Sequence, residues 1–126
     1  MFIRFIVAGD SIMRVLGIDP GTRITGYGVV EKQENKLVCL THGEIKPSNN
    51  APLSTRLVAI YDQLIEVVKQ TTPDAVAIED IFFGKNVRSL IKQGEIRGVA
   101  ILVGSHKHIP VFEYAPLKVK QAITGM

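Results

Sequence analysis

The sequence of 126 residues contains a single cysteine, Cys39, no tryptophan, and only 6% aromatic residues. One cysteine excludes an intrachain disulfide and a cysteine-based metal cage, and it gives no sign of an oxidising compartment. No apolar run reaches the roughly 20 residues that a membrane-spanning helix needs. The apolar start at residues 1–7 is too short for a signal peptide, and Arg4 interrupts it. We therefore expect a cytoplasmic protein that makes no contact with a membrane.

The rest of the composition is that of one folded domain with an uneven charge distribution. Hydrophobic residues make up 46% and charged residues 21% of the chain, which is ordinary for a globular protein. The net charge is +3, but residues 85–120 hold seven basic and two acidic side chains, whereas the remainder holds eight and ten. This basic segment favours a polyanion partner such as nucleic acid, although a solvated helix face would produce the same count.

The spacing of apolar residues predicts an α/β fold with the order β-β-β-α-β-α-β. The turn at Pro20-Gly21 separates two strands of a hairpin, and Pro52 follows two candidate helix caps, Asn49 and Asn50. Three antiparallel strands followed by alternating helices and strands indicate a mixed five-stranded sheet flanked by helices. The expected elements are strands at 15–18, from 22 to 30, 37–45, 75–78 and 111–114, helices at 53–70 and 85–107, and the start of a further helix at 117.

Two carboxylates, Asp19 and Glu79, each end a predicted strand. If the first and fourth strands are neighbours, both side chains emerge at one edge of the sheet, where they repel unless a divalent cation lies between them. Carboxylate oxygens without histidine or cysteine suit a hard ion such as Mg²⁺. The alternative is that Asp19 caps the turn and Glu79 pairs with an arginine. Asp80 alternates to the other face of its strand and is expected away from this pair.

Other features allow both a structural and a functional interpretation. Phe82 and Phe83 follow the acidic strand end, and they either pack beneath the loop or stack on an unpaired base. Gly94 and Gly98 form a flat strip on the second helix, which allows close packing on the sheet or on a twin helix in a dimer. We expect Cys39 to lie in the core.

Five blocks of sequence together resemble RuvC-type Holliday junction resolvases, in that family's order and spacing. They are RVLGIDPGTRITGYGVV at 14–30, AIEDIFFGKN at 77–86, GEIRGVAIL at 94–102, VFEYAPLKVK at 111–120 and AITGM at 122–126. The resemblance implies a ribonuclease-H-like fold. It also implies a homodimer that binds four-way junction DNA in recombination and repair, beside the RuvA–RuvB branch-migration complex.

The resemblance also assigns the chemistry to particular residues. It implies symmetric phosphodiester hydrolysis by water activated at two ions of Mg²⁺ or Mn²⁺, with Asp19 and Glu79 as catalytic residues and metal ligands. Phe82 matches the aromatic residue that wedges into the junction. The residues expected along the DNA are Phe82, Phe83, Lys85, Asn86, Arg88, Lys118 and Lys120.

Two departures from the family bear on activity. Residues 1–12 precede the family's usual start, and Met13 resembles the natural initiator. We therefore expect residues 1–12 to be an extra leader and 13–126 to be the nuclease domain without its last helix. The family's last helix, with two further acidic ligands, would follow Met126, and its absence should expose apolar surface on the sheet. A catalytically incomplete junction-binding fragment is therefore an alternative. An actin-like or sugar-kinase-type phosphate-binding domain is a remote alternative, because only the GIDPGT motif suggests it.

Phe82→Ala tests the two interpretations of the aromatic pair, in a chain that carries the family's last helix. If Phe82 unstacks bases, the substitution slows cleavage of a four-way junction more than it weakens junction binding, because stacking on a base contributes about 1–3 kcal/mol. Cleavage rates and dissociation constants for the same labelled junction provide the comparison. An unchanged rate would favour packing beneath the loop.

Overall fold

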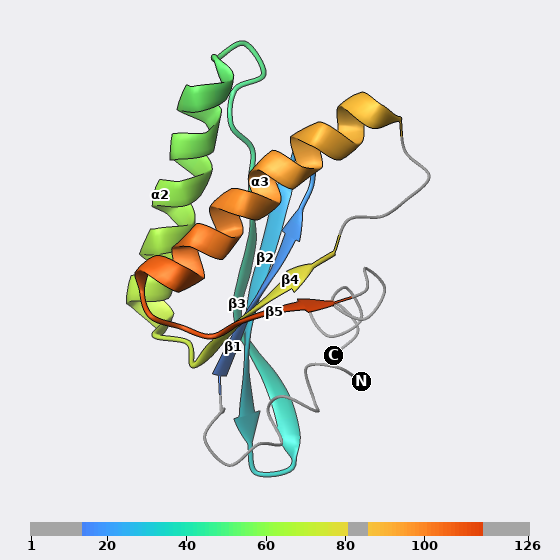
Figure 1. Ribbon diagram of the computed structural model, residues 1–126. Helices are drawn as coiled ribbons and strands as arrows, with labels where there is room; N and C mark the ends of the chain where they lie inside the picture. Colours follow the sequence, from blue (N-terminus) through green and yellow to red (C-terminus); the bar gives the residue numbers. More distant parts are fainter. Residues whose placement is uncertain (1–13, 81–85, 115–126) are drawn as a thin grey trace.

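A computed structural model of the protein describes residues 14–80 and 86–114, which form one sheet and two helices (Figure 1). In chain order the elements are β1 (Arg14–Pro20), β2 (Thr25–Gln33), β3 (Lys36–Ile45), α2 (Leu53–Thr71), β4 (Ala75–Glu79), α3 (Val87–His106) and β5 (Val111–Tyr114). The predicted order of elements is confirmed. The further helix expected from residue 117 lies outside the described residues. Neither described helix has the length and apolar content of a membrane span.

The sheet is mixed, as predicted, with the strand order β3-β2-β1-β4-β5. The first three strands pair antiparallel, β4 pairs parallel with β1, and β5 pairs parallel with β4. β1 is therefore the central strand. Its residues 15–18 are fully or almost fully buried because strands lie on both of its sides.

The two helices differ in how their first turns are capped, and the cap of α2 is not the one predicted. α2 begins after Pro52, which occupies the N-cap position without a side-chain cap, so the expectation that Asn49 or Asn50 caps this helix was wrong. α3 has a side-chain cap, since the Asn86 side chain accepts a hydrogen bond of 2.9 Å from the Ser89 backbone N–H. This is the usual solution for an unsatisfied donor in the first turn of a helix.

Both helices cover the same face of the sheet and enclose the core there (Figure 1). Alternation along each strand places every second side chain under the helices. The main members of this core are Leu16, Ile18, Val29, Ile45, Ile60, Leu64, Val76, Ile78, Ile96, Ala100 and Val103.

The other face of the sheet is also buried at the centre. Val15, Val30, Ala75 and Ala77 point away from the core residues of their strands, and each is at most 1% exposed. These four central positions expose no apolar surface, whereas Leu40 on β3 is 39% exposed; the expectation of exposed apolar surface on the sheet stays a prediction. The expectation of a buried Cys39 was wrong, because β3 is an edge strand and this thiol is exposed.

Arg14, at the start of β1, forms hydrogen bonds that connect three elements of the fold. Its Nε donates to Glu31 Oε2 at 2.7 Å, and its guanidinium also donates to the Thr71 carbonyl at the end of α2. Hydrogen bonds from the Gln33 and Arg14 side chains lower the pKa of the Glu31 carboxyl below its usual range. Arg14 therefore joins β1 to β2 and α2, at the end of β1 that lies away from Asp19.

α3 approaches the sheet closely at one glycine and is open at another. A Cβ on Gly104 would lie 2.4 Å from Val111 Cγ2 and 3.4 Å from Val76 Cγ2, whereas a Cβ on Gly98 would meet nothing within 4 Å. Gly104 is thus needed for contact with β4 and β5. The sequence analysis left two partners open for the glycine strip, the sheet or a twin helix. At Gly98 the described residues of the sheet make no close contact with the helix.

Gly104→Ala should destabilise the fold, with Gly98→Ala as its matched control on the same helix. The methyl group at Gly104 overpacks the core, which costs about 1–3 kcal/mol. The same methyl group at Gly98 gains up to about 1 kcal/mol of helix propensity and meets no neighbour. Urea unfolding at low protein concentration measures both changes, and equal effects of the two substitutions would contradict this packing.

Candidate metal centre and DNA-facing residues

Asp19 and Glu79 lie at the same edge of the sheet, as predicted from their positions at strand ends. β1 and β4 run parallel with Ile18 opposite Ile78, so the next residues of the two strands, Asp19 and Glu79, are level. Both follow the alternation of Val15 and Ala77, which places them on the face opposite the helices. The register of two neighbouring strands therefore brings the two carboxylates together.

The environment of the pair suits a divalent cation. Glu79 is only 3% exposed and Asp19 is partly buried. Burying an ionised carboxylate is costly unless cations or hydrogen-bond donors compensate it. The donor set consists of carboxylate oxygens, which Mg²⁺ and Mn²⁺ prefer. Among residues 14–80 and 86–114, no group of three or more acidic, histidine or cysteine side chains converges.

The turn after Asp19 and the neighbouring strand keep the carboxylate accessible. The Gly21 backbone N–H donates to the Asp19 carbonyl at 3.0 Å, and a Cβ on Gly21 would lie 2.2 Å from the Ile24 carbonyl oxygen. Only glycine therefore fits this tight turn. Gly26 pairs with Asp19 across the β1–β2 ladder and presents no side chain there. A Cβ at Gly26 would lie 3.8 Å from Asp19 Cβ, so a side chain there would extend beside the carboxylate.

Two of the residues predicted along the DNA lie in the described part of the chain. Asn86 and Arg88 are both exposed at the start of α3. Asn86 caps the helix, which is a structural role that the sequence analysis did not consider. The remaining predicted residues, Phe82, Phe83, Lys85, Lys118 and Lys120, lie outside the described residues.

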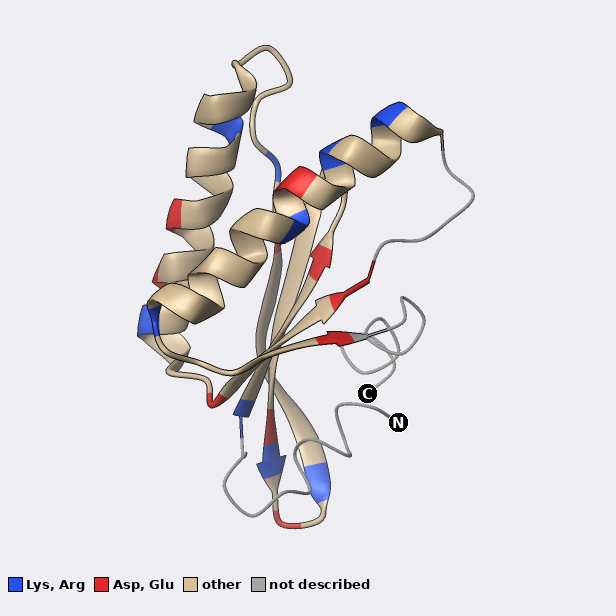
Figure 2. Ribbon diagram, viewed as in Figure 1, with Lys and Arg blue, Asp and Glu red and all other residues tan. Residues whose placement is uncertain are grey.

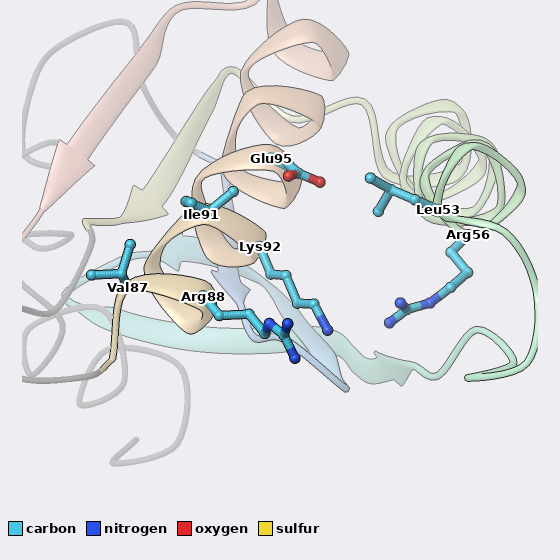
Figure 3. A pocket seen from close by; sticks show the side chains of 7 residues that line it. All are labelled: Leu53, Arg56, Val87, Arg88, Ile91, Lys92 and Glu95. Carbon is cyan, nitrogen blue, oxygen red and sulfur yellow. The ribbon is translucent and has the colours of Figure 1, made fainter.

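Arg88 belongs to a basic cluster that joins both helices. An open pocket of about 370 Å³ lies between the start of α2 and the first half of α3. The bases Arg56, Arg88 and Lys92 line it together with the acid Glu95 and the apolar side chains of Leu53, Val87 and Ile91. In Figure 3, Arg88 and Lys92 extend side by side from α3, and Arg56 points toward them from α2. Arg56 also donates to the Thr22 carbonyl at 3.3 Å, which ties it to the turn after β1. Sequence reasoning missed Arg56 because its partners lie on another helix.

Sequence reasoning also gave no role to Arg97, which it counted only as part of the basic segment. In the structure Arg97 forms ion pairs with Asp80 and Glu113, at the ends of β4 and β5. Figure 2 shows these acidic strand ends beside a basic position on α3. Asp80 therefore faces the helices, as expected from its alternation with Glu79.

Comparisons with known proteins agree on one family. The family model for crossover junction endodeoxyribonuclease RuvC matches residues 15–126. Proteins of that name from Desulforamulus reducens and Syntrophotalea carbinolica are 46% and 50% identical to this chain over 113 residues. These matches cover 90% of this chain and 69% and 70% of the two relatives.

Solved structures show the same similarity. The structure of T. thermophilus RuvC in complex with a Holliday junction substrate matches with a TM-score of 0.78 and 35% identity, over 90% of this chain and 70% of that chain. The yeast mitochondrial Holliday junction resolvase Ydc2 matches with a TM-score of 0.59 and 14% identity, and an Aquifex aeolicus PPX-GPPA enzyme with 0.51 and 13%. These last two similarities show the fold alone.

Asp19→Asn and Glu79→Gln should each weaken the binding of Mn²⁺. Each substitution removes one charged ligand, and we expect a loss of at least about tenfold, the scale on which even outer-shell residues act in metal sites. Calorimetric titration of the intact chain with Mn²⁺ provides the dissociation constants. Asp62→Asn is the control, since Asp62 is an exposed carboxylate on α2; equal losses in all three variants would contradict this metal centre.

Proposed function

The chain belongs to the crossover junction endodeoxyribonuclease RuvC family, and on that basis we propose that it is a metal-dependent nuclease that resolves Holliday junctions in DNA recombination and repair. The observation that carries this proposal is the level placement of Asp19 and Glu79 on adjacent parallel strands. The symmetric pair of nicks, the use of Mg²⁺ or Mn²⁺ and the number of ions are parts of the same proposal.

The placement of the residues supports their proposed roles. Asp19 and Glu79 would hold the cation from β1 and β4, and the burial of Glu79 restricts the positions its carboxylate can take. A bound divalent cation polarises the scissile phosphate and lowers the pKa of water. Gly26 leaves room beside Asp19 for a DNA backbone, because no side chain extends from β2 at that point.

Binding of DNA is assigned to the basic cluster and to the residues around it. Arg88, Lys92 and Arg56 place three cationic groups at one opening between the helices. Neutralising backbone phosphates with such groups releases counterions, so binding weakens as salt increases. Asn86 and the residues outside the described ranges, Phe82, Phe83, Lys85, Lys118 and Lys120, remain proposed DNA contacts on the basis of the family resemblance.

A homodimer is supported by an apolar row on α3 that no described residue covers. Val87, Ile91 and Leu102 are 71%, 57% and 52% exposed, and they share one helix face with Gly98. A twin α3 related by a twofold axis would bury this row, and the same axis would place two active sites on two DNA strands. Action beside the RuvA–RuvB complex and location in the cytoplasm stay predictions.

A junction-cleavage assay tests this function. The chain is mixed with a labelled four-way junction or a linear duplex of equal length, with and without Mg²⁺, at two salt concentrations. We expect preferential binding of the junction, weaker binding at higher salt, and paired nicks that require Mg²⁺. Asp19→Asn should abolish nicking and preserve binding, because it removes a metal ligand and one negative charge near phosphate.

The outcomes separate recognition from catalysis. Selective binding without nicking would contradict nuclease activity of this chain and support its DNA specificity. Equal affinity for junction and duplex, in a chain that circular dichroism shows to be folded, would contradict the whole proposal. Nicking by Asp19→Asn would remove Asp19 from the metal centre.

A further inference from the structure

The pocket between α2 and α3 gathers positive charge that its surroundings leave uncompensated. The bases Arg56, Arg88 and Lys92 line it beside the acid Glu95. Within residues 14–80 and 86–114, none of the three bases forms an ion pair. The Nε of Arg56 is buried and has no hydrogen-bond partner among these residues. Guanidinium and ammonium groups in such a place suit a phosphate group, which takes several charge-assisted hydrogen bonds at once.

The pocket and the carboxylate pair belong to the same edge of the sheet but to opposite faces. Arg56 donates to the carbonyl of Thr22, which lies in the turn that follows Asp19 and β1. The helices that form the pocket cover one face of the sheet (Figure 1), whereas Asp19 and Glu79 point to the other face. The ends of β1 and β4 therefore separate the two places, and a single phosphate does not reach both.

A single straight duplex does not reach both places either. The major groove of B-DNA is about 12 Å wide and admits one helix or a two-stranded ribbon. The edge in question combines a five-stranded sheet with a layer of helices, and one helix alone is about 10–12 Å across. A duplex that presents a phosphate to the carboxylates therefore leaves the pocket vacant. A four-way junction has further arms, which leave the exchange point in other directions.

We propose that Arg56, Arg88 and Lys92 bind a backbone phosphate of a second junction arm, and that this contact determines the preference for four-way over linear DNA. This inference rests on the junction-resolving function proposed above. Two contacts on one DNA molecule reinforce each other, because the first raises the effective concentration of the second. A linear duplex occupies one place at a time and lacks this gain. In the proposed homodimer, two metal centres and two pockets would provide one contact for each of the four arms.

The double variant Arg88→Gln/Lys92→Gln tests this role, because both side chains are exposed and lie outside the core. Dissociation constants of the intact chain are measured for a labelled four-way junction and a linear duplex of equal length, without divalent cations, over a range of salt concentrations. Junction binding should weaken by more than about tenfold near 0.15 M salt, and its salt dependence should fall by about two phosphate contacts. Duplex binding should weaken by less than about threefold, since a duplex retains the metal-facing surface.

A matched control and a variant of opposite sign accompany this measurement. Lys69→Gln/Lys107→Gln removes two exposed bases from the far ends of the same helices, so it has the same net charge as the double variant. It should leave the ratio of junction to duplex affinity unchanged. Glu95→Gln should increase that ratio, because it removes a negative charge beside the bound phosphate. Circular dichroism establishes that each variant is folded under the conditions of the titration.

The possible failures are distinguishable. If the double variant loses affinity for junction and duplex by the same factor, or for neither, the pocket is no site for a second arm and the inference is overturned, while the proposed function stands. The same holds if the control lowers the ratio as much as the double variant, since net charge alone then explains the preference. If the wild-type chain binds junction and duplex equally, the proposed function fails and the inference falls with it.

Discussion

The parallel pairing of β1 with β4 is the constraint on which the rest of the site depends. Ile18 lies opposite Ile78, so the two carboxylates that follow are level and share a face of the sheet. A slip of one residue would turn one carboxylate toward the helices and leave it in the core. The hydrophobic core therefore determines how the two carboxylates are placed, because the residues that bury Ile18 and Ile78 also hold the register.

α3 contacts both the core and the molecular surface, because its faces meet different neighbours. Ile96, Ala100 and Val103 enter the core, and Arg97, beside them, reaches the acidic ends of β4 and β5. On the outer side, the bases Arg88 and Lys92 form one row and exposed apolar residues form another. The proposed metal site, DNA surface and dimer contact therefore all involve residues that α3 carries or contacts.

The sequence was sufficient to predict the elements, their order and the carboxylate pair, because these depend on local periodicity and on where strands end. Residues 53–70 and 75–78 were predicted within one residue of the observed bounds of α2 and β4. Cys39 was misplaced because a strand's position at the edge of a sheet is a property of the whole topology. Arg97 and Arg56 were missed for the same reason, since their contacts join separate elements.

The distribution of charge follows from the same topology. A count of charges along residues 85–120 treats every base as part of one surface. On the helix α3, however, these bases point in different directions around the helix axis. Arg97, itself largely buried, pairs with the exposed acids Asp80 and Glu113, whereas Arg88 and Lys92 line an open pocket with Arg56 from α2. The electrostatic attraction for DNA therefore depends on fewer bases of this segment than the sequence suggests, and it gains one base from outside it. The charge of a binding surface is the sum over the side chains that the fold brings together, and it can differ from the charge of any one segment of the sequence.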